Sequence, residues 1–122
     1  ESPRSLAAIK AADLCVVPAR PATFDIWAAE VTGRKLRLMG KEFIFLLNQC
    51  PRANHRVQEG VAALEAVGAL LRPYIRARAD FLEAARTGKG VTEVDRKGTA
   101  AQEIRDLWLA LKRRLRPIQT CG

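Results

Sequence analysis

Few of the residue types that carry out catalytic chemistry are grouped in this sequence of 122 residues. The single histidine, His55, lies in the segment PRANHR beside two arginines, with no serine, cysteine or carboxylate at a catalytic spacing. Two pairs of carboxylates, Asp25 with Glu30 and Glu103 with Asp106, fall on expected outer faces of helices. Solvated salt bridges are commoner there than acid–base catalysis. We therefore expect no catalytic residue in this chain.

The glycines and cysteines also lack a ligand-binding arrangement. Neither of the common phosphate-binding patterns, GxxxxGK[ST] and GxGxxG, occurs in the sequence. The nearest approach, Gly88 to Gly90, follows an expected helix, whereas a phosphate loop opens one. The three cysteines show no CxxC pair and no nearby histidine, so we expect no metal site.

The composition is that of a folded, basic domain. Hydrophobic residues make up 48% and charged residues 28%, with a formal net charge of +8. The excess of positive charge is spread along the chain, which favours nucleic acid or an acidic partner. No apolar run approaches the roughly 20 residues that cross a bilayer, so we expect a cytoplasmic protein without a membrane partner.

Strand and helix patterns alternate along the chain. Residues 14–17 and 43–47 are continuous apolar runs without alternation, which is typical of strands buried on both faces of a parallel sheet. A third run, 69–75, predicts a strand although Pro73 interrupts it. The fold class is therefore α/β, a three-layer arrangement in which helices cover a parallel sheet of about three strands, forming one domain over residues 1–122. We expect helices over 5–12, 23–40, 54–67, 80–86 and 99–115, and a loop over 89–98.

Helical spacing also predicts which side chains face the core. Phe24, Trp27 and Val31 follow the i, i+3, i+7 pattern, so we expect them to point inward. In the last helix, Trp108 and Leu111 belong to an apolar stripe that we expect to face the core as well.

Ligands of parallel α/β sheets bind at the carboxyl ends of the strands. In this chain those ends are Pro18–Pro21, Asn48–Arg52 and Arg76–Arg78. These three segments are the candidate ligand-binding region.

The strand ends resemble the C-terminal half of the ParA family of DNA-partitioning ATPases, within the ParA/MinD group of P-loop proteins. The segment AADLCVVPARPATFDIWAAEVT is similar to a family strand that ends in a Pro-x-x-Pro loop before a helix. The segment FLLNQCPRANHRV is similar to the family strand that ends in Asn and a Pro-Arg loop. The segment IRARADFLEAARTGKGVTEVDRKGTAAQEI has the family's arginine-rich stretch, its Glu-Ala and Gly-Lys pairs, and its final helix. The resemblance covers almost the whole chain and implies a partial P-loop NTPase fold.

The resemblance assigns roles to residues at these strand ends. Asn48 would recognise the adenine ring, since an amide offers both a donor and an acceptor. The backbone around Ile75 and Arg76 would flank the base. Family members also bind DNA without sequence preference, and the matching positions are Arg52, Arg76 and Arg78.

The family's phosphate loop and the aspartates that hold Mg²⁺ lie in an N-terminal half that these residues do not include. The resemblance implies ATP and Mg²⁺ as ligands of the intact protein, but we expect neither to bind well to this chain alone. The intact protein would be an ATPase for plasmid or chromosome partitioning, and this chain by itself would be inactive. Its expected partners are non-specific DNA, a centromere-binding partition protein and a second copy, since a sheet edge without its neighbour favours self-association.

Two other readings remain open. One is a standalone, non-enzymatic basic module that binds nucleic acid or a protein partner. The other is a MinD-like ATPase positioned on a membrane. The second is disfavoured because Trp108, Leu111 and Leu115 form a core-type stripe, and the segment LRPIQTCG after it is too short for an amphipathic membrane helix.

Overall fold

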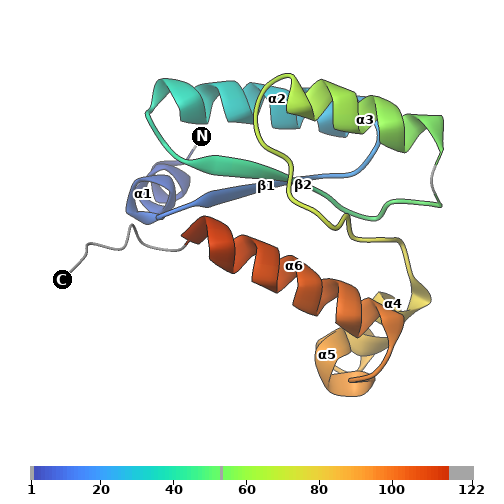
Figure 1. The fold of residues 1–122 in the computed structure, drawn as a ribbon. Helices are drawn as coiled ribbons and strands as arrows, with labels where there is room; N and C mark the ends of the chain where they lie inside the picture. The colour runs from blue at the N-terminus through green and yellow to red at the C-terminus, as the bar shows by residue number, and fades with distance from the viewer. Residues whose placement is uncertain (1, 53, 116–122) are drawn as a thin grey trace.

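A small parallel sheet with helices on both faces forms the structure, a computed structural model that describes residues 2–52 and 54–115 (Figure 1). Helices α2 and α3 lie side by side over one face, and α6 lies under the other. The elements are α1 (Pro3–Ala11), β1 (Cys15–Ala19), α2 (Thr23–Leu38), β2 (Phe43–Leu47), α3 (His55–Glu65), α4 (Ala79–Arg86), α5 (Val91–Val94) and α6 (Thr99–Leu115).

The two strands pair in parallel, with Cys15 opposite Phe43 and Ala19 opposite Leu47. The α/β class is confirmed, and β2 has the predicted bounds. The strand β1 runs two residues further than expected, through Pro18. This proline is tolerated because alternate residues of a parallel strand face alternate neighbours, and Pro18 faces the edge of β1 that no strand of residues 2–52 and 54–115 covers.

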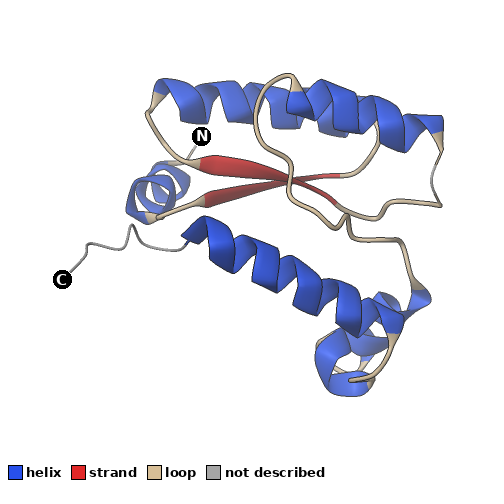
Figure 2. Cartoon of the chain, in the orientation of Figure 1, coloured by secondary structure: helices blue, strands red, loops and turns tan. Residues whose placement is uncertain are grey.

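The prediction of a third strand over 69–75 is wrong in detail. Figure 2 shows this segment as loop, and it contributes only isolated parallel bridges, Phe45 with Leu70 and Cys50 with Arg76. It still follows β2, because the Leu71 N–H donates to the Phe45 carbonyl at 2.8 Å. Pro73 lacks an N–H and interrupts the ladder between the two bridges.

The face under α2 and α3 holds the main core. Phe45, Leu47 and Leu64 are completely buried there. The strand side chains alternate, so every second residue of β2 points to this face. The expected inward residues of α3 are confirmed in Val57 and Leu64, and the Asn54 side chain caps this helix by accepting from the Val57 N–H at 3.1 Å.

The expected inward face of α2 is wrong. Phe24, Trp27 and Val31 are 77%, 58% and 50% exposed. Small side chains lie against the sheet instead, because a Cβ at Gly33 would come within 2.5 Å of the Phe45 ring. The helix thus approaches the strands too closely for a large residue at position 33. Its buried residues are Ile26, Ala29, Gly33 and Leu36.

The face toward α6 is covered less completely. Ile44 and Leu71 are buried, yet Val16 on β1 is 38% exposed. In the apolar stripe of α6, Leu111 is half-buried but Trp108 is 52% exposed, so the expectation that Trp108 faces the core is wrong for the part of the chain described.

The prediction of a loop over 89–98 missed the short helix α5. The Gly90 N–H donates to the Glu93 carboxylate at 2.9 Å and closes a helical turn there.

Among the described residues, none of the helices has the length and apolar character that a bilayer crossing needs. Glu1 and the tail 116–122, including most of the segment LRPIQTCG, lie outside the described residues.

Candidate functional site

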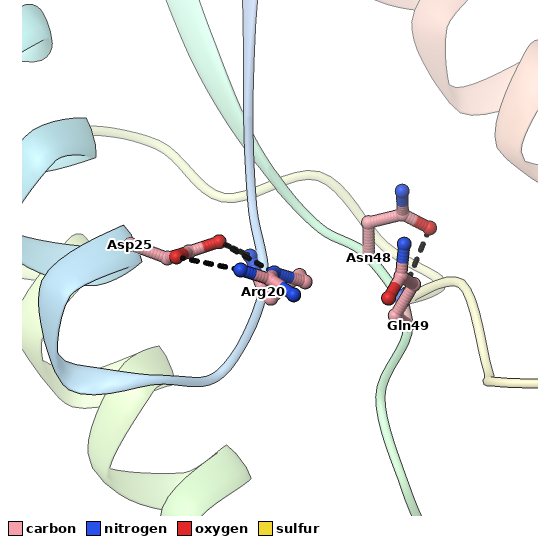
Figure 3. Close-up of polar contacts among 4 residues, drawn as sticks. All are labelled: Arg20, Asp25, Asn48 and Gln49. Atoms are coloured by element: carbon pink, nitrogen blue, oxygen red, sulfur yellow. Dashed lines mark hydrogen bonds and ion pairs between the residues drawn. The ribbon is translucent and has the colours of Figure 1, made fainter.

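The carboxyl ends of β1 and β2 lie next to each other, as the parallel pairing requires. The Asn48 N–H donates to the Ala19 carbonyl at 2.9 Å, which fixes Asn48 beside the end of β1. Arg20 follows β1 directly. Figure 3 shows the side chains of Arg20 and Asn48 projecting from these two neighbouring strand ends.

The chain turns sharply just after Asn48. Gln49 has φ = 54°, a left-handed backbone conformation that is uncommon for a residue other than glycine. The Asn48 Oδ1 atom accepts the Gln49 N–H at 2.9 Å, which stabilises the turn. One lone pair of Oδ1 is used in this way. The second lone pair and the Nδ2 amino group keep hydrogen-bonding capacity for a ligand.

The segment 75–77 is held beside this turn by backbone hydrogen bonds. The Cys50 N–H donates to the Ile75 carbonyl at 2.9 Å, and the Ala77 N–H donates to the Cys50 carbonyl at 2.8 Å. The Cys50 side chain is buried below the turn, and desolvation raises the pKa of its thiol above the ordinary value. Cys50 therefore supports the turn as an apolar residue and is not placed to act as a nucleophile.

A pocket of about 480 Å³ opens between this turn, the segment 76–78 and helix α4. Three of the predicted site residues line it together: Asn48, Arg76 and Arg78. One wall is apolar, and its leucine, Leu82, is 71% exposed. The remaining lining residues are Gln49, Ala77, Phe81, Leu82 and Ala85.

Arg78 is already engaged by a carboxylate from α6. Its Nε donates to Glu103 Oε1 at 3.2 Å and its Nη2 to Oε2 at 2.8 Å, with side-chain exposures of 26% and 19%. The hydrogen bonds to Glu103 raise the pKa of Arg78 further, so this guanidinium keeps its charge at all ordinary pH values. A phosphate at Arg78 would have to compete with Glu103.

The other two predicted positions lie outside the pocket lining. Ile75 donates its N–H to the Leu47 carbonyl at 3.0 Å and accepts from Cys50, so its backbone groups are used in holding the segment. A backbone contact with a ligand is therefore better supplied by Arg76. Arg52 is exposed on the loop that follows β2. His55 is exposed at the start of α3.

One ion pair near the site was not anticipated from the sequence. Arg20 Nε donates to Asp25 Oδ2 at 2.8 Å and Arg20 Nη2 to Oδ1 at 3.2 Å (Figure 3). The hydrogen bond from Arg20 lowers the pKa of Asp25 below its ordinary value. The five-residue spacing across a strand-to-helix turn was the available signal, since Asp25 lies in the first turn of α2.

The chemistry of the pocket suits a flat heterocycle. The Asn48 amide offers a donor and an acceptor to the edge of a ring, while Phe81 and Leu82 offer an apolar wall to its face. Arg76 brings a guanidinium to the same opening. The described residues include no group of three or more metal-ligating side chains. The pocket thus combines an amide, an apolar wall and a guanidinium at one opening.

Comparison with solved structures gives a similarity at the level of the fold. No family model matches the sequence, and no curated protein matches it. Among solved structures, the MinD cell division protein of Aquifex aeolicus superposes with a TM-score of 0.64 at 19% sequence identity. The alignment covers 91% of this chain and 48% of that chain, so these residues span about half the length of MinD. The fold is accordingly similar to that of about half of MinD.

Proposed function

We propose that this chain supplies the base-binding side of a ParA/MinD-type ATPase. The observation that carries the proposal is the pocket that brings Asn48, Arg76 and Arg78 together at the carboxyl end of β2. The similarity to half of MinD supports it at the level of the fold. The intact protein would use ATP and Mg²⁺ to position plasmids or chromosomes, together with a centromere-binding partner protein.

The residues present fit one part of such a ligand. Asn48 would bind the edge of adenine, the apolar wall would cover its face, and Arg76 would flank it through its backbone and guanidinium. The phosphates and Mg²⁺ would need the glycine-rich loop and the aspartates that this sequence lacks. We therefore expect the chain alone to bind adenosine about as well as it binds ATP, and both weakly.

The test is a titration of the 122-residue chain with adenosine, followed by backbone amide chemical shifts in NMR. We expect shift changes that concentrate at residues 48–50 and 76–78. Asn48→Ala should reduce the affinity about tenfold, in keeping with the loss of two hydrogen bonds. Gln58→Ala, an exposed change on α3, is the matched control and should leave the titration unchanged. Equal responses to adenosine and guanosine, or no response near Asn48, would overturn adenine recognition.

DNA binding is the second part of the proposed activity. Arg52 is exposed and Arg76 lies at the pocket opening, so both can reach a phosphate backbone. Each phosphate that an arginine neutralises steepens the salt dependence of binding by about one unit of slope. We expect Arg52→Ala and Arg76→Ala each to weaken duplex binding and flatten the salt slope. Arg78→Ala should have a smaller effect because Glu103 already neutralises that side chain.

The net charge of +8 favours one alternative, a standalone basic module that binds nucleic acid without a nucleotide. The two functions separate in one experiment, in which DNA binding is measured while adenosine is titrated against the parent chain and Asn48→Ala. The alternative predicts salt-dependent DNA binding together with no adenosine response in either protein. The ATPase assignment predicts an adenosine response that Asn48→Ala removes.

A further inference from the structure

Helix α2 carries an apolar stripe that the described structure leaves at least half exposed. The stripe consists of Phe24, Trp27, Val31 and Leu38, whose side chains are 77%, 58%, 50% and 88% exposed. Their spacings of three, four and seven residues place them along one line of the helix. Phe24 and Trp27 stack edge to face, with ring centroids 5.5 Å apart. These two side chains form a preorganised apolar end of the stripe.

The stripe lies on the side of α2 opposite the sheet, with Trp27 at the edge of a groove between α2 and α3. The residues of α2 that pack on β1 and β2 include Ile26 and Gly33, which lie on the opposite side of the helix. A strand added at the free edge of β1 would widen the sheet, and its helices would lie beside α2 in the same layer. The stripe would stay uncovered, so completion of the NTPase fold does not explain it.

The exposed area is large for a single helix face. Four side chains of this size and exposure present on the order of 500 Å² of apolar surface. A patch of this size is at the upper end of what monomeric proteins expose, and patches of that size are often functional.

We propose that this stripe is a self-association surface, on which α2 of a second copy packs in antiparallel orientation. Val31 is the midpoint of the stripe, seven residues from both Phe24 and Leu38. In an antiparallel pair centred on Val31, Phe24 of one copy therefore meets Leu38 of the other. Each end of the stripe thus complements the opposite end, as a two-fold interface requires.

The charges beside the stripe complement each other in the same arrangement. Glu30 and Arg34 occupy one flank of α2, since they are four residues apart. A two-fold axis across the helices brings this flank against its own copy. Glu30 of one chain and Arg34 of the other then lie about 3 Å apart along the helix axis, given a rise of 1.5 Å per residue. On a lipid surface Glu30 would face apolar tails, and on an acidic helix it would face like charge. A second copy of the chain therefore fits better.

The surface is small for a dimer interface. Two stripes would bury on the order of 1,000 Å² in total, which lies just below the range of standard stable interfaces. We therefore expect a dimer that forms and dissociates with concentration in the micromolar range.

Sedimentation equilibrium of the 122-residue chain, over a hundredfold range of concentration, tests the proposal by charge reversal. Glu30→Arg and Arg34→Glu, each alone, should weaken dimerisation about tenfold, because each places like charges across the interface twice. An equimolar mixture of the two variants should restore the parent affinity, since the mixed dimer again pairs opposite charges. Each variant has like charges within its own helix, so only contact between chains can produce this rescue.

Truncation of the stripe gives the second test. Trp27→Ala should weaken the dimer about 100-fold, because a central tryptophan dominates small interfaces. Leu109→Ala removes another exposed apolar side chain, on α6, and should leave association unchanged. Circular dichroism would confirm that all variants keep their helix content.

Three results would overturn the proposal. The first is a parent chain that remains monomeric throughout the range, including one that instead binds phosphatidylglycerol vesicles or an acidic helical peptide. The second is a dimer that all α2 variants leave intact, which would move association to another surface such as the free edge of β1. The third is the absence of rescue in the mixture of Glu30→Arg and Arg34→Glu.

Discussion

The two faces of the sheet are covered by helices to different degrees. Under α2 and α3 the core is closed, and Phe45, Leu47 and Leu64 have no solvent exposure. On the α6 side, Val16 is 38% exposed and Trp108 is 52% exposed. Stability should therefore reside in the first face, while the second face is held by fewer contacts.

The candidate site lies where these two regions meet. Its amide, Asn48, follows directly from the well-packed strand β2, whereas Arg78 is positioned through Glu103 on the less firmly packed α6. The base-binding side of the pocket should thus be rigid and its arginine side adjustable. Local stability of this kind is measurable, because segments with few buried contacts open at a lower cost than the core.

The largest contrast between the faces is expected from two truncations. Leu64→Ala removes a fully buried side chain from the closed core and should lower the free energy of unfolding by about 3 to 5 kcal/mol. Trp108→Ala removes a side chain that is half exposed on α6 and should cost about 1 kcal/mol or less. Urea denaturation followed by circular dichroism measures both. Equal losses would show that the two faces contribute alike.

A smaller effect is expected from one added methyl group at the closed face. A Cβ at Gly33 would lie 2.5 Å from the Phe45 ring, which is completely buried and cannot move aside. Gly33→Ala should destabilise the chain by about 1 to 3 kcal/mol despite the better helix propensity of alanine.

The matched control is Gly90→Ala, where the nearest atom to the new Cβ is 3.7 Å away. This change should alter stability by less than about 0.5 kcal/mol. If Gly33→Ala proved as harmless as Gly90→Ala, the close approach of α2 to the sheet would be disproved.

The contact between Gly33 and Phe45 explains why the hydrophobic spacing predicted the wrong inner face for α2. Hydrophobic spacing gives most weight to large residues such as Phe24 and Trp27, and these define an apparent inner face. The true inner face consists of Ile26, Ala29, Gly33 and Leu36, and the two small residues at its middle permit close packing against the strands. Spacing alone does not reveal which of two apolar stripes has room against the sheet.

Other parts of the fold were predictable because the signal was local. The run Phe43–Leu47 is continuously apolar, and its bounds as β2 match the prediction. The region of the candidate site followed from the rule that parallel strands bring their carboxyl ends together. The pairing of Arg78 with Glu103 was not predictable, because the two residues are 25 positions apart and meet only through the placement of α6.

That pair offers a way to loosen the less stable face selectively. Glu103→Gln keeps the shape of the side chain but removes the charge that binds Arg78 at 2.8 Å. We expect a global destabilisation of about 1 kcal/mol and faster amide hydrogen exchange in α6, with little change in α3. The same variant should strengthen DNA binding, since it frees the Arg78 guanidinium.

Glu83→Gln is the control for this change. Its partner Arg86 lies 3.4 Å away on the surface of α4, and both side chains are at least 66% exposed. Exposed pairs of this kind contribute little, so neither stability nor exchange in α6 should change. Faster exchange in α3 than in α6 for Glu103→Gln would contradict the proposed difference between the faces.

The smallest effect concerns the exposed ion pair at the start of α2. The hydrogen bond from Arg20 lowers the folded-state pKa of Asp25, so the carboxylate is favoured in the folded chain. The contribution of this carboxylate to stability is therefore fully present above its unfolded-state pKa of about 3.9, and it is lost as the pH falls through the folded-state pKa.

NMR titration of the Asp25 carboxyl carbon should show a midpoint below that of an ordinary aspartate. Arg20→Ala should return the midpoint toward that of an ordinary aspartate, whereas Arg72→Ala, which removes the partner of Glu65, should leave it unchanged. Because both Arg20 and Asp25 face solvent, 0.5 M salt should narrow the difference between parent and Arg20→Ala. If the midpoint changed neither with salt nor with Arg20→Ala, the ion pair would not be one of the contacts that hold α2 at the edge of the site.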